Sequence, residues 1–324
     1  MTALVIYPWF KASYYGFYLQ GLWEIFPGAR AAFSLRGFPQ LHHHCLAFRI
    51  SGRNIYVSAG DGPGINQEAL AWCHVYAKVN LGIDVSAAKL FPVGPSFGLR
   101  FLPLWRAFCW SLRTCRRPNG VTHSLREHFA EYWRQWRYRL PERDYQPSPP
   151  HPNYVFYLGT LWKQEPETNT FRANFIRACR SVPALRFEGG LISRPDVAGF
   201  DDVVAPERIS LSDYIQKTRS SVVVFNTPAV QGCHGWKLAE FLALGKVVIS
   251  TPLKRMLPAP LAHGVHIHYT DGSADSLKKA LEFIHGNPAY QASLGKAARE
   301  YYDRYLAPKS VMGRILRQAG VTVG

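Results

Sequence analysis

The second half of the chain alternates short apolar runs with amphipathic stretches. Runs rich in β-branched and aromatic residues, typical of strands, occupy 154–162, 185–190, 222–227 and 246–251. Between them, 167–182, 210–221 and 236–244 space their apolar residues as helices do. Strands that alternate with helices at this spacing predict a parallel sheet covered on both faces, with right-handed crossovers. This half therefore predicts a Rossmann-like α/β domain.

The first half shows a similar but less regular pattern. The run "ALVIYPW" (3–9) predicts a strand that ends at Pro8. A helix is predicted over 14–26 and another strand over 29–35. The stretch "LAFRISGRNIYVSAGD" (46–61) holds two extended runs broken at Ser51-Gly52, which predicts a hairpin. We expect a second α/β domain here.

Between the two halves the character of the chain changes. Residues 100–143 hold ten arginines against three glutamates, interleaved with tryptophans, and prolines then stand at 141, 147, 149, 150 and 152. Such a proline-rich stretch favours a stiff, extended connector. We therefore predict domains at 1–150 and 151–302. The last residues, 303–324, are expected to form a helix that turns away from the second sheet and packs back toward the N-terminal domain.

Overall charge adds a constraint on partners. The 324 residues carry a formal net charge of +16 and a pI near 9.7, which points to an anionic partner such as nucleic acid, a phosphorylated ligand or an acidic membrane surface. The six cysteines form no CxxC pair, so reduced thiols are expected. No signal peptide and no membrane span of roughly 20 apolar residues is predicted.

The stretch "GCHGWKLAEFLALGKVVIS" (232–250) has the layout of a ligand site. Gly232 and Gly235 let the backbone approach a ligand, and the helix that follows offers unpaired N–H groups, a combination that suits a phosphate. Lys237 adds a full charge, and Glu240 is placed to accept hydrogen bonds from a sugar diol. Gly245 is expected to end the helix. The alternative for Lys237 and Glu240 is an i,i+3 ion pair on the surface.

The run "HGWKLAEFLALGKVVIS" resembles the donor-binding segment of GT-B glycosyltransferases. The resemblance implies two Rossmann-like domains facing a cleft, with the acceptor in the N-terminal domain and a nucleotide-sugar in the C-terminal one. It implies that Lys237 contacts the donor diphosphate and that Glu240 contacts the ribose. "YVFYLGTLWK" looks like the first strand of the C-terminal domain of such enzymes, which places Lys163 near the phosphates.

One departure bears on stereochemistry. Many retaining members of the family carry a glutamate eight residues before the position of Glu240, where this chain has Gly232. Inversion is therefore favoured over retention, and Cys233 and His234 are left near the expected place of the sugar. His234 is a candidate to hydrogen-bond the sugar or phosphate, with loop capping as the alternative.

An inverting transferase needs a general base for the acceptor hydroxyl. Asp61, after the strand "NIYVSAG", is the candidate, and an ordinary Asp-Gly turn is the alternative. The run His42-His43-His44 is a weaker rival, and it is a poor chelate because adjacent residues of a strand point to opposite faces. We expect no metal site and no permanently bound cofactor, with a nucleotide-diphosphate sugar as donor substrate.

The sequence thus predicts a metal-independent glycosyltransferase that moves a sugar onto a glycan or a lipid-linked glycan, in the synthesis of a surface polysaccharide, capsule or lipopolysaccharide. The segment 100–143 suits a peripheral position on the anionic inner face of the cytoplasmic membrane. Two alternatives for this segment stay open. It is either a pair of solvated helices with inward tryptophans, or the contact surface of a non-catalytic nucleic-acid-binding protein.

Overall fold

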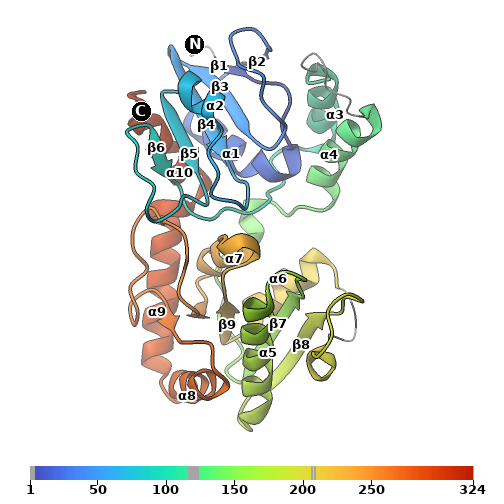
Figure 1. Ribbon diagram of the computed structural model, residues 1–324, viewed down its shortest axis with the longest axis vertical. Coiled ribbons are helices and arrows are strands. Elements are labelled where there is room, and N and C mark those ends of the chain that lie inside the picture. The colour runs from blue at the N-terminus through green and yellow to red at the C-terminus, as the bar shows by residue number, and fades with distance from the viewer. Residues whose placement is uncertain (1–3, 116–123, 206, 208, 324) are drawn as a thin grey trace. The chain divides into compact units, whose positions relative to one another are not determined.

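A computed structural model describes residues 4–115, 124–205, 207 and 209–323. The chain divides into two compact units. The N-terminal unit comprises Met1–Asp144, Met256–Pro258 and Tyr305–Gly324, and the C-terminal unit comprises Tyr145–Arg255 and Ala259–Arg304. Each unit has its own β-strands with helices beside them (Figure 1).

The sheet of the N-terminal unit has six strands in the order β2-β1-β3-β4-β5-β6. The strands are β1 (Leu4–Ile6), β2 (Ala31–Phe33), β3 (Leu46–Ile50), β4 (Arg53–Ser58), β5 (Val75–Lys78) and β6 (Leu90–Pro92). All neighbours are parallel except β3, which runs antiparallel to both β1 and β4. The hairpin expected at Ser51-Gly52 is confirmed. Both residues have positive φ (49° and 72°), the conformation of a two-residue turn whose twist matches that of the strands.

The helices of this unit are α1 (Ala12–Ile25), α2 (Gln67–Trp72), α3 (Leu104–Arg113), α4 (Leu125–Arg137) and α10 (Pro308–Gln318). The α10 helix packs against α1, so the expected return of the C-terminal helix to the N-terminal half is confirmed. Gly21 makes this packing possible, because a Cβ atom there would lie 1.9 Å from the carbonyl oxygen of Pro308. Among the described residues, no helix is both long enough and apolar enough to cross a membrane.

The C-terminal unit has the parallel α/β architecture that its sequence pattern predicts. Its strands are β7 (Tyr154–Thr160), β8 (Arg186–Ile192), β9 (Val223–Asn226), β10 (Val247–Ser250) and β11 (His268–Tyr269). β7 pairs with β8, and β9, β10 and β11 form a second ladder, all in parallel. The two ladders meet where the Val222 N–H donates to the Tyr154 carbonyl at 2.8 Å.

The α-helices of this unit are α5 (Pro166–Ser181), α6 (Leu211–Ser220), α7 (Trp236–Ala243), α8 (Ala274–His285) and α9 (Pro288–Tyr301). Strands β9 and β10 are buried along their whole length, as expected for parallel strands covered on both faces. In the core, Phe175 of α5 stacks on Phe225 of β9 with ring centroids 4.7 Å apart. This packing holds α5 against the strands and so positions the strand ends that carry the site.

Candidate functional site

A pocket of about 250 Å³ opens at the carboxyl ends of the strands of the C-terminal unit. The end of β7, the end of β9 and the start of α7 supply most of its wall. The lining residues are Tyr157, Leu158, Gly159, Thr160, Trp162, Arg172, Ile192, Phe225, Asn226, Thr227, Ala229, Gly235, Trp236 and Lys237. Ligands of parallel α/β sheets bind at this edge, because loops and helix starts converge there.

Lys237 lies in the first turn of α7 and brings a cation into the pocket. Lys237 as a whole is partly exposed, and its ammonium group donates to the Leu158 carbonyl oxygen. Nζ also stands 4.6 Å from the centroid of the Tyr157 ring, a cation–π contact. The pKa of Lys237 is lowered to about 7, mainly by burial and then by the nearby Arg172 charge, while Glu240 acts in the opposite direction.

Arg172 is a second cation in the same pocket, and it was not predicted from the sequence. It comes from α5, its residue is only 7% exposed, and its Nη1 donates to the Thr160 carbonyl at the end of β7. Its Nε has no hydrogen-bond partner among the described residues. A buried guanidinium with an unused donor is costly unless an anion takes it up, so Arg172 is suited to bind one.

A sequence signal for Arg172 does exist. The buried positions of α5 include 168, 169, 172, 175, 176 and 179, which follow one face of a helix. Arg172 therefore stands at a position where the helical pattern calls for an apolar residue. An arginine on the core-facing stripe of a helix is rare unless it has a partner, and this could have marked it as a candidate.

Lining and helix geometry together favour an anionic ligand. Of the described residues that line the pocket, none is acidic, and two are cations. Gly235 is the N-cap residue of α7 and has no side chain to cap the helix, and Gly235, Trp236 and Lys237 at this helix start all line the pocket, where the partial positive charge of a helix N-terminus favours an anion. The helix ends as expected at Gly245 (φ 60°), where the Lys246 N–H donates to the Phe241 carbonyl at 3.0 Å.

The glycines of the predicted motif have different roles in the structure. Gly235 lines the pocket, whereas Gly232 is not part of the lining. Gly232 has φ 70° and follows Gln231 with φ 56°, so two left-handed residues in succession turn the chain before α7. The structure thus gives Gly232 a conformational role, and its contact with a ligand stays a prediction.

Glu240 lies one turn after Lys237 and is only 5% exposed. The alternative of a surface ion pair between these residues does not fit this burial. Burial raises the pKa of Tyr214, and the charge of the nearby Glu240 raises it further. Glu240 is not among the residues that line the pocket, and its contact with a ribose stays a prediction.

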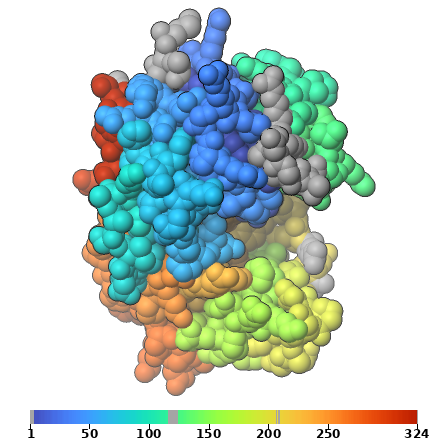
Figure 2. Space-filling view, turned by 45° about the horizontal axis from the view of Figure 1, so that its top comes forward, coloured from blue at the N-terminus to red at the C-terminus, as the bar shows by residue number. Residues whose placement is uncertain are grey.

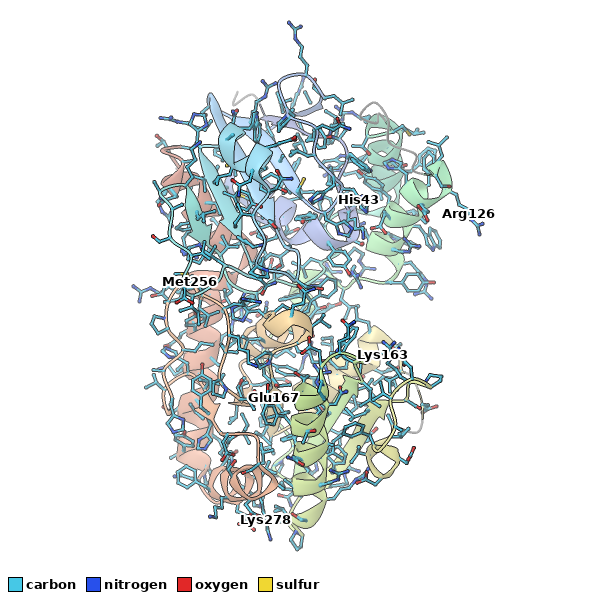
Figure 3. The ribbon with its side chains drawn as sticks, viewed as in Figure 1. His43, Arg126, Lys163, Glu167, Met256 and Lys278 are labelled. Atoms are coloured by element: carbon cyan, nitrogen blue, oxygen red, sulfur yellow. The ribbon has the colours of Figure 1, made fainter. Side chains whose placement is uncertain are left out.

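The three other predicted residues lie outside the pocket lining. Lys163 is exposed on the loop after β7 (Figure 3), next to Trp162, which does line the pocket. His234 is buried, with 5% of its surface exposed. Asp61 belongs to the N-terminal unit, where it is exposed on the loop that follows the carboxyl end of β4. Their proposed roles stay predictions.

No described group of three or more His, Cys, Asp and Glu side chains is arranged to hold a metal ion. Within the histidine run, the His44 backbone N–H donates to Nδ1 of His42 at 3.1 Å. This contact makes His42 part of a local turn.

Comparisons with known proteins complete the description. No protein-family model matches the sequence, and no curated protein matches it. Among solved structures, the chain is similar to a glycosyltransferase from Rickettsia africae (9% identity, 81% of this chain and 69% of that chain, TM-score 0.46). It is also similar to HepE from Anabaena in complex with UDP (12% identity, 78% and 74%, TM-score 0.44). A third similar structure is the UDP-GlcNAc 2-epimerase from Neisseria meningitidis bound to UDP-GlcNAc (10% identity, 81% and 68%, TM-score 0.43).

Proposed function

We propose that this protein is a GT-B glycosyltransferase that transfers a sugar from a nucleoside-diphosphate sugar to a glycan or lipid-linked glycan. One observation carries the proposal. Lys237 and Arg172 converge on a pocket at the carboxyl ends of parallel strands, and no acidic residue stands in its described lining. The resemblance of 234–250 to a donor-binding segment supports it from the sequence.

The two cations have a direct task in this reaction. When the glycosidic bond to the donor breaks, negative charge develops on the departing diphosphate, and prepositioned cations in a water-poor site stabilise it strongly. Lys237 and Arg172 are held in place by backbone carbonyls at the end of β7, so little reorganisation is needed at the moment of bond breaking. The start of α7 adds the partial positive charge of a helix N-terminus.

The rest of the pocket suits the nucleoside. Trp162 and Trp236 stand in the lining and offer aromatic surface for a base. Glu240, one turn beyond Lys237, is the carboxylate that we assign to the ribose hydroxyls. We keep Lys163 as a more distant contact of the phosphates.

For the chemical step we propose inversion, with Asp61 as the base that takes the proton of the acceptor hydroxyl. Its exposed carboxylate lies at the carboxyl end of β4, the edge at which α/β sheets bind their ligands. His234 is proposed to hydrogen-bond the transferred sugar. The acceptor class that we propose is a surface polysaccharide or lipopolysaccharide precursor.

Thermal shift measurements test the donor site. The full chain is melted with UDP, GDP, ADP and a panel of nucleotide sugars, and one nucleoside diphosphate should raise the melting temperature with a saturating dose response. Lys237→Ala should lose this protection, whereas Lys296→Ala, a change at an exposed lysine of α9, should keep it. Equal protection of the Lys237→Ala variant and the unaltered protein would refute the proposed site.

A further inference from the structure

The helices α3 and α4 of the N-terminal unit each pack one face against the rest of the unit. On α3 the buried residues are Ala107, Trp110 and Ser111, followed by Thr114, and on α4 they are His128, Tyr132 and Gln135. The hydroxyls of Thr114 and Tyr132 lie 2.8 Å apart and join the two helices. One face of each helix is thus already satisfied by packing inside the unit. Residues 116–123 of the arginine-rich segment lie outside the described residues.

A second apolar face of α3 points away from the protein. Leu104, Trp105, Phe108 and Leu112 are between 45% and 62% exposed. Leu104, Phe108 and Leu112 recur every four residues, and Trp105 lies three residues before Phe108, so the four side chains form one stripe along the helix. Four large apolar side chains on one exposed stripe exceed the scattered exposure that is normal on a monomer.

Helix α4 repeats this arrangement. Leu125 and Trp133 are 60% and 49% exposed, and Phe129 and Trp136 lie beside them, partly exposed. The rings of Trp133 and Trp136 stand 5.1 Å apart. The stripe on α4 therefore presents aromatic side chains, which favour the boundary between water and hydrocarbon.

The two stripes meet over a groove of about 470 Å³. Leu104 and Phe108 of α3 form one wall, and Phe129 and Trp133 of α4 form the other. Arg126 stands at this groove and lies on the outer side of α4 (Figure 3). We call the surface formed by these two stripes the α3–α4 surface; its members are Leu104, Trp105, Phe108, Leu112, Leu125, Phe129, Trp133 and Trp136. The helices that carry it are coloured green at the upper right of Figure 2.

Arginines border the α3–α4 surface. At 100° per residue, Arg106 and Arg113 lie along one edge of the α3 stripe, and Arg126 and Arg137 lie beside the α4 stripe. The acidic residues of α4 occupy another side. Among them, Glu131 accepts from Ser13 and from Arg134, both at 2.6 Å. The border of the surface is therefore basic, and Glu131 is held by partners inside the unit.

A second hollow, of about 500 Å³, adjoins the stripe of α3. Three arginines line it, Arg30, Arg106 and Arg113, together with Trp105 of the exposed stripe. Nη2 of Arg113 donates to the Ala31 carbonyl at 3.0 Å, which fixes its guanidinium at this place. Arginine is the preferred partner of a phosphate because its planar fork can bind two oxygens at once.

We propose that the α3–α4 surface docks on a membrane that contains anionic phospholipids. The exposed stripes enter the boundary between headgroups and acyl chains, the bordering arginines contact headgroup phosphates, and the hollow of Arg30, Arg106 and Arg113 receives one headgroup. An amphipathic surface with a basic rim has the properties that favour such binding. The proposal does not depend on the proposed enzymatic function.

Charge complementarity selects the membrane over two other occupants. A second copy of this chain on the α3–α4 surface would bring its own arginines against those of the first, with no acidic residue on the stripes to offset them. A nucleic acid would match the arginines, but the leucines of the two stripes, Leu104, Leu112 and Leu125, would remain in water. An anionic bilayer is complementary to both the apolar and the charged parts of the surface.

Vesicle sedimentation with the full chain tests the proposal. Vesicles of phosphatidylcholine alone are compared with vesicles that contain phosphatidylglycerol at about one third of the lipid. We expect the partition coefficient to be at least ~10-fold higher with the anionic lipid. Brominated lipids should quench tryptophan fluorescence, and Trp105→Phe combined with Trp133→Phe should reduce that quenching.

Two double variants, each with a matched control, separate the contribution of the arginines to vesicle binding from that of the apolar side chains. Arg126→Glu with Arg137→Glu should lower binding to anionic vesicles at least ~10-fold, whereas the same charge change made by Lys279→Glu with Lys296→Glu should have little effect. Trp105→Ala with Phe108→Ala should also lower binding at least ~10-fold. Its control is Val265→Ala with Phe283→Ala, which removes two exposed apolar side chains of the C-terminal unit.

Four results would overturn the proposal. The first two are absence of binding to anionic vesicles and equal binding by the α3–α4 variants and the unaltered protein. The third is an oligonucleotide that binds in place of vesicles through the same arginines. The fourth is a dimer, seen in light scattering, that the double variant Trp105→Ala with Phe108→Ala dissociates. All substituted side chains are exposed, so melting temperatures should stay unchanged. Thermal protection by a nucleoside diphosphate should persist in these variants, which separates this test from that of the donor site.

Discussion

The donor pocket and the α3–α4 surface are both basic, but they hold their charge in different ways. In the pocket, Lys237 and Arg172 are enclosed by protein, and each donates to a backbone carbonyl at the end of β7. On the α3–α4 surface, arginines such as Arg126 and Arg137 are exposed and stand beside apolar side chains that are exposed as well.

This difference has consequences for recognition. Enclosed charges have lost much of their hydration, so they interact strongly with a ligand that fits and are screened little by salt. Exposed charges act over about a Debye length and lose strength as salt is added. The pocket is therefore suited to a defined small anion, whereas the surface is suited to an extended anionic partner.

Removal of Lys237 should have the largest effect. Lys237→Ala takes away the charge at the start of α7, and we expect at least ~100-fold weaker binding of a nucleoside diphosphate, in line with the loss of a charge-assisted contact in an enclosed site. Isothermal titration measures the affinity, with Lys296→Ala as the control. A loss below twofold would contradict the role of Lys237 as a ligand of the diphosphate.

The same position predicts an opposite effect on stability. The pKa of Lys237 is lowered to about 7 in the folded chain from about 10.5 when unfolded, so the unfolded chain binds more protons between these values. The burial of Lys237 therefore costs most below pH 7, and this cost decreases as the pH rises toward 10.5. Lys237→Met should raise the melting temperature at pH 6, with a smaller gain at pH 9.

Arg172 should rank second. Arg172→Met keeps the length of the side chain within the apolar stripe of α5 but removes the guanidinium, and we expect ~30-fold weaker binding of the diphosphate. Arg172→Lys should restore part of the affinity because it returns the charge without the fork. Circular dichroism melts should show that both variants fold. Unchanged affinity of the Met variant would make Arg172 a packing residue only.

Salt should distinguish the two basic regions directly. Between about 50 and 300 mM NaCl, binding of the full chain to anionic vesicles should fall at least ~10-fold, because the arginines of the α3–α4 surface are exposed. Binding of the diphosphate to the enclosed pocket should change less than about threefold. Equal salt dependence of the two would show that the cations of the pocket are hydrated like those of the surface.

A smaller effect is expected from pH. A bound diphosphate favours the ammonium form of Lys237, so its pKa rises above 7 in the complex and binding takes up a proton above that pH. Affinity for a nucleotide sugar, whose phosphates do not titrate in this range, should fall ~5-fold from pH 7 to pH 8 and level off below pH 7. Lys237→Met should abolish this dependence, as titration calorimetry in two buffers can show.

The smallest effect is expected at Gly232. Gly232→Ala places a Cβ atom on a residue with φ 70°, which should lower the free energy of unfolding by ~1 kcal/mol. Gly232→Asn should cost less, because asparagine adopts this conformation more readily. Gly28→Ala is the control, since a Cβ there meets no atom within 4 Å and its φ is not positive. Denaturant titration measures all three.

Local features of the fold were predictable because neighbours along the chain decide them. The hairpin at Ser51-Gly52 and the helix end at Gly245 depend on residues that adopt positive φ, and the structure confirms both. The pocket wall at Gly235 and Lys237 follows from the order strand, loop, helix. Strands β6 and β11 were not predicted, because β6 ends in Pro92, a residue that is unfavourable in strands, and β11 has only two residues.

The sequence by itself determined the α/β class, the parallel direction of the C-terminal strands and the position of Lys237 at a helix start, because these depend on periodicity and on glycine. Only the tertiary structure decided that Arg172 reaches the same pocket, since α5 and α7 are far apart along the chain and both contribute residues to its lining. It also decided which apolar face of α3 and α4 is covered. Periodicity shows that a helix has apolar faces, but only packing shows which of them remains in contact with water.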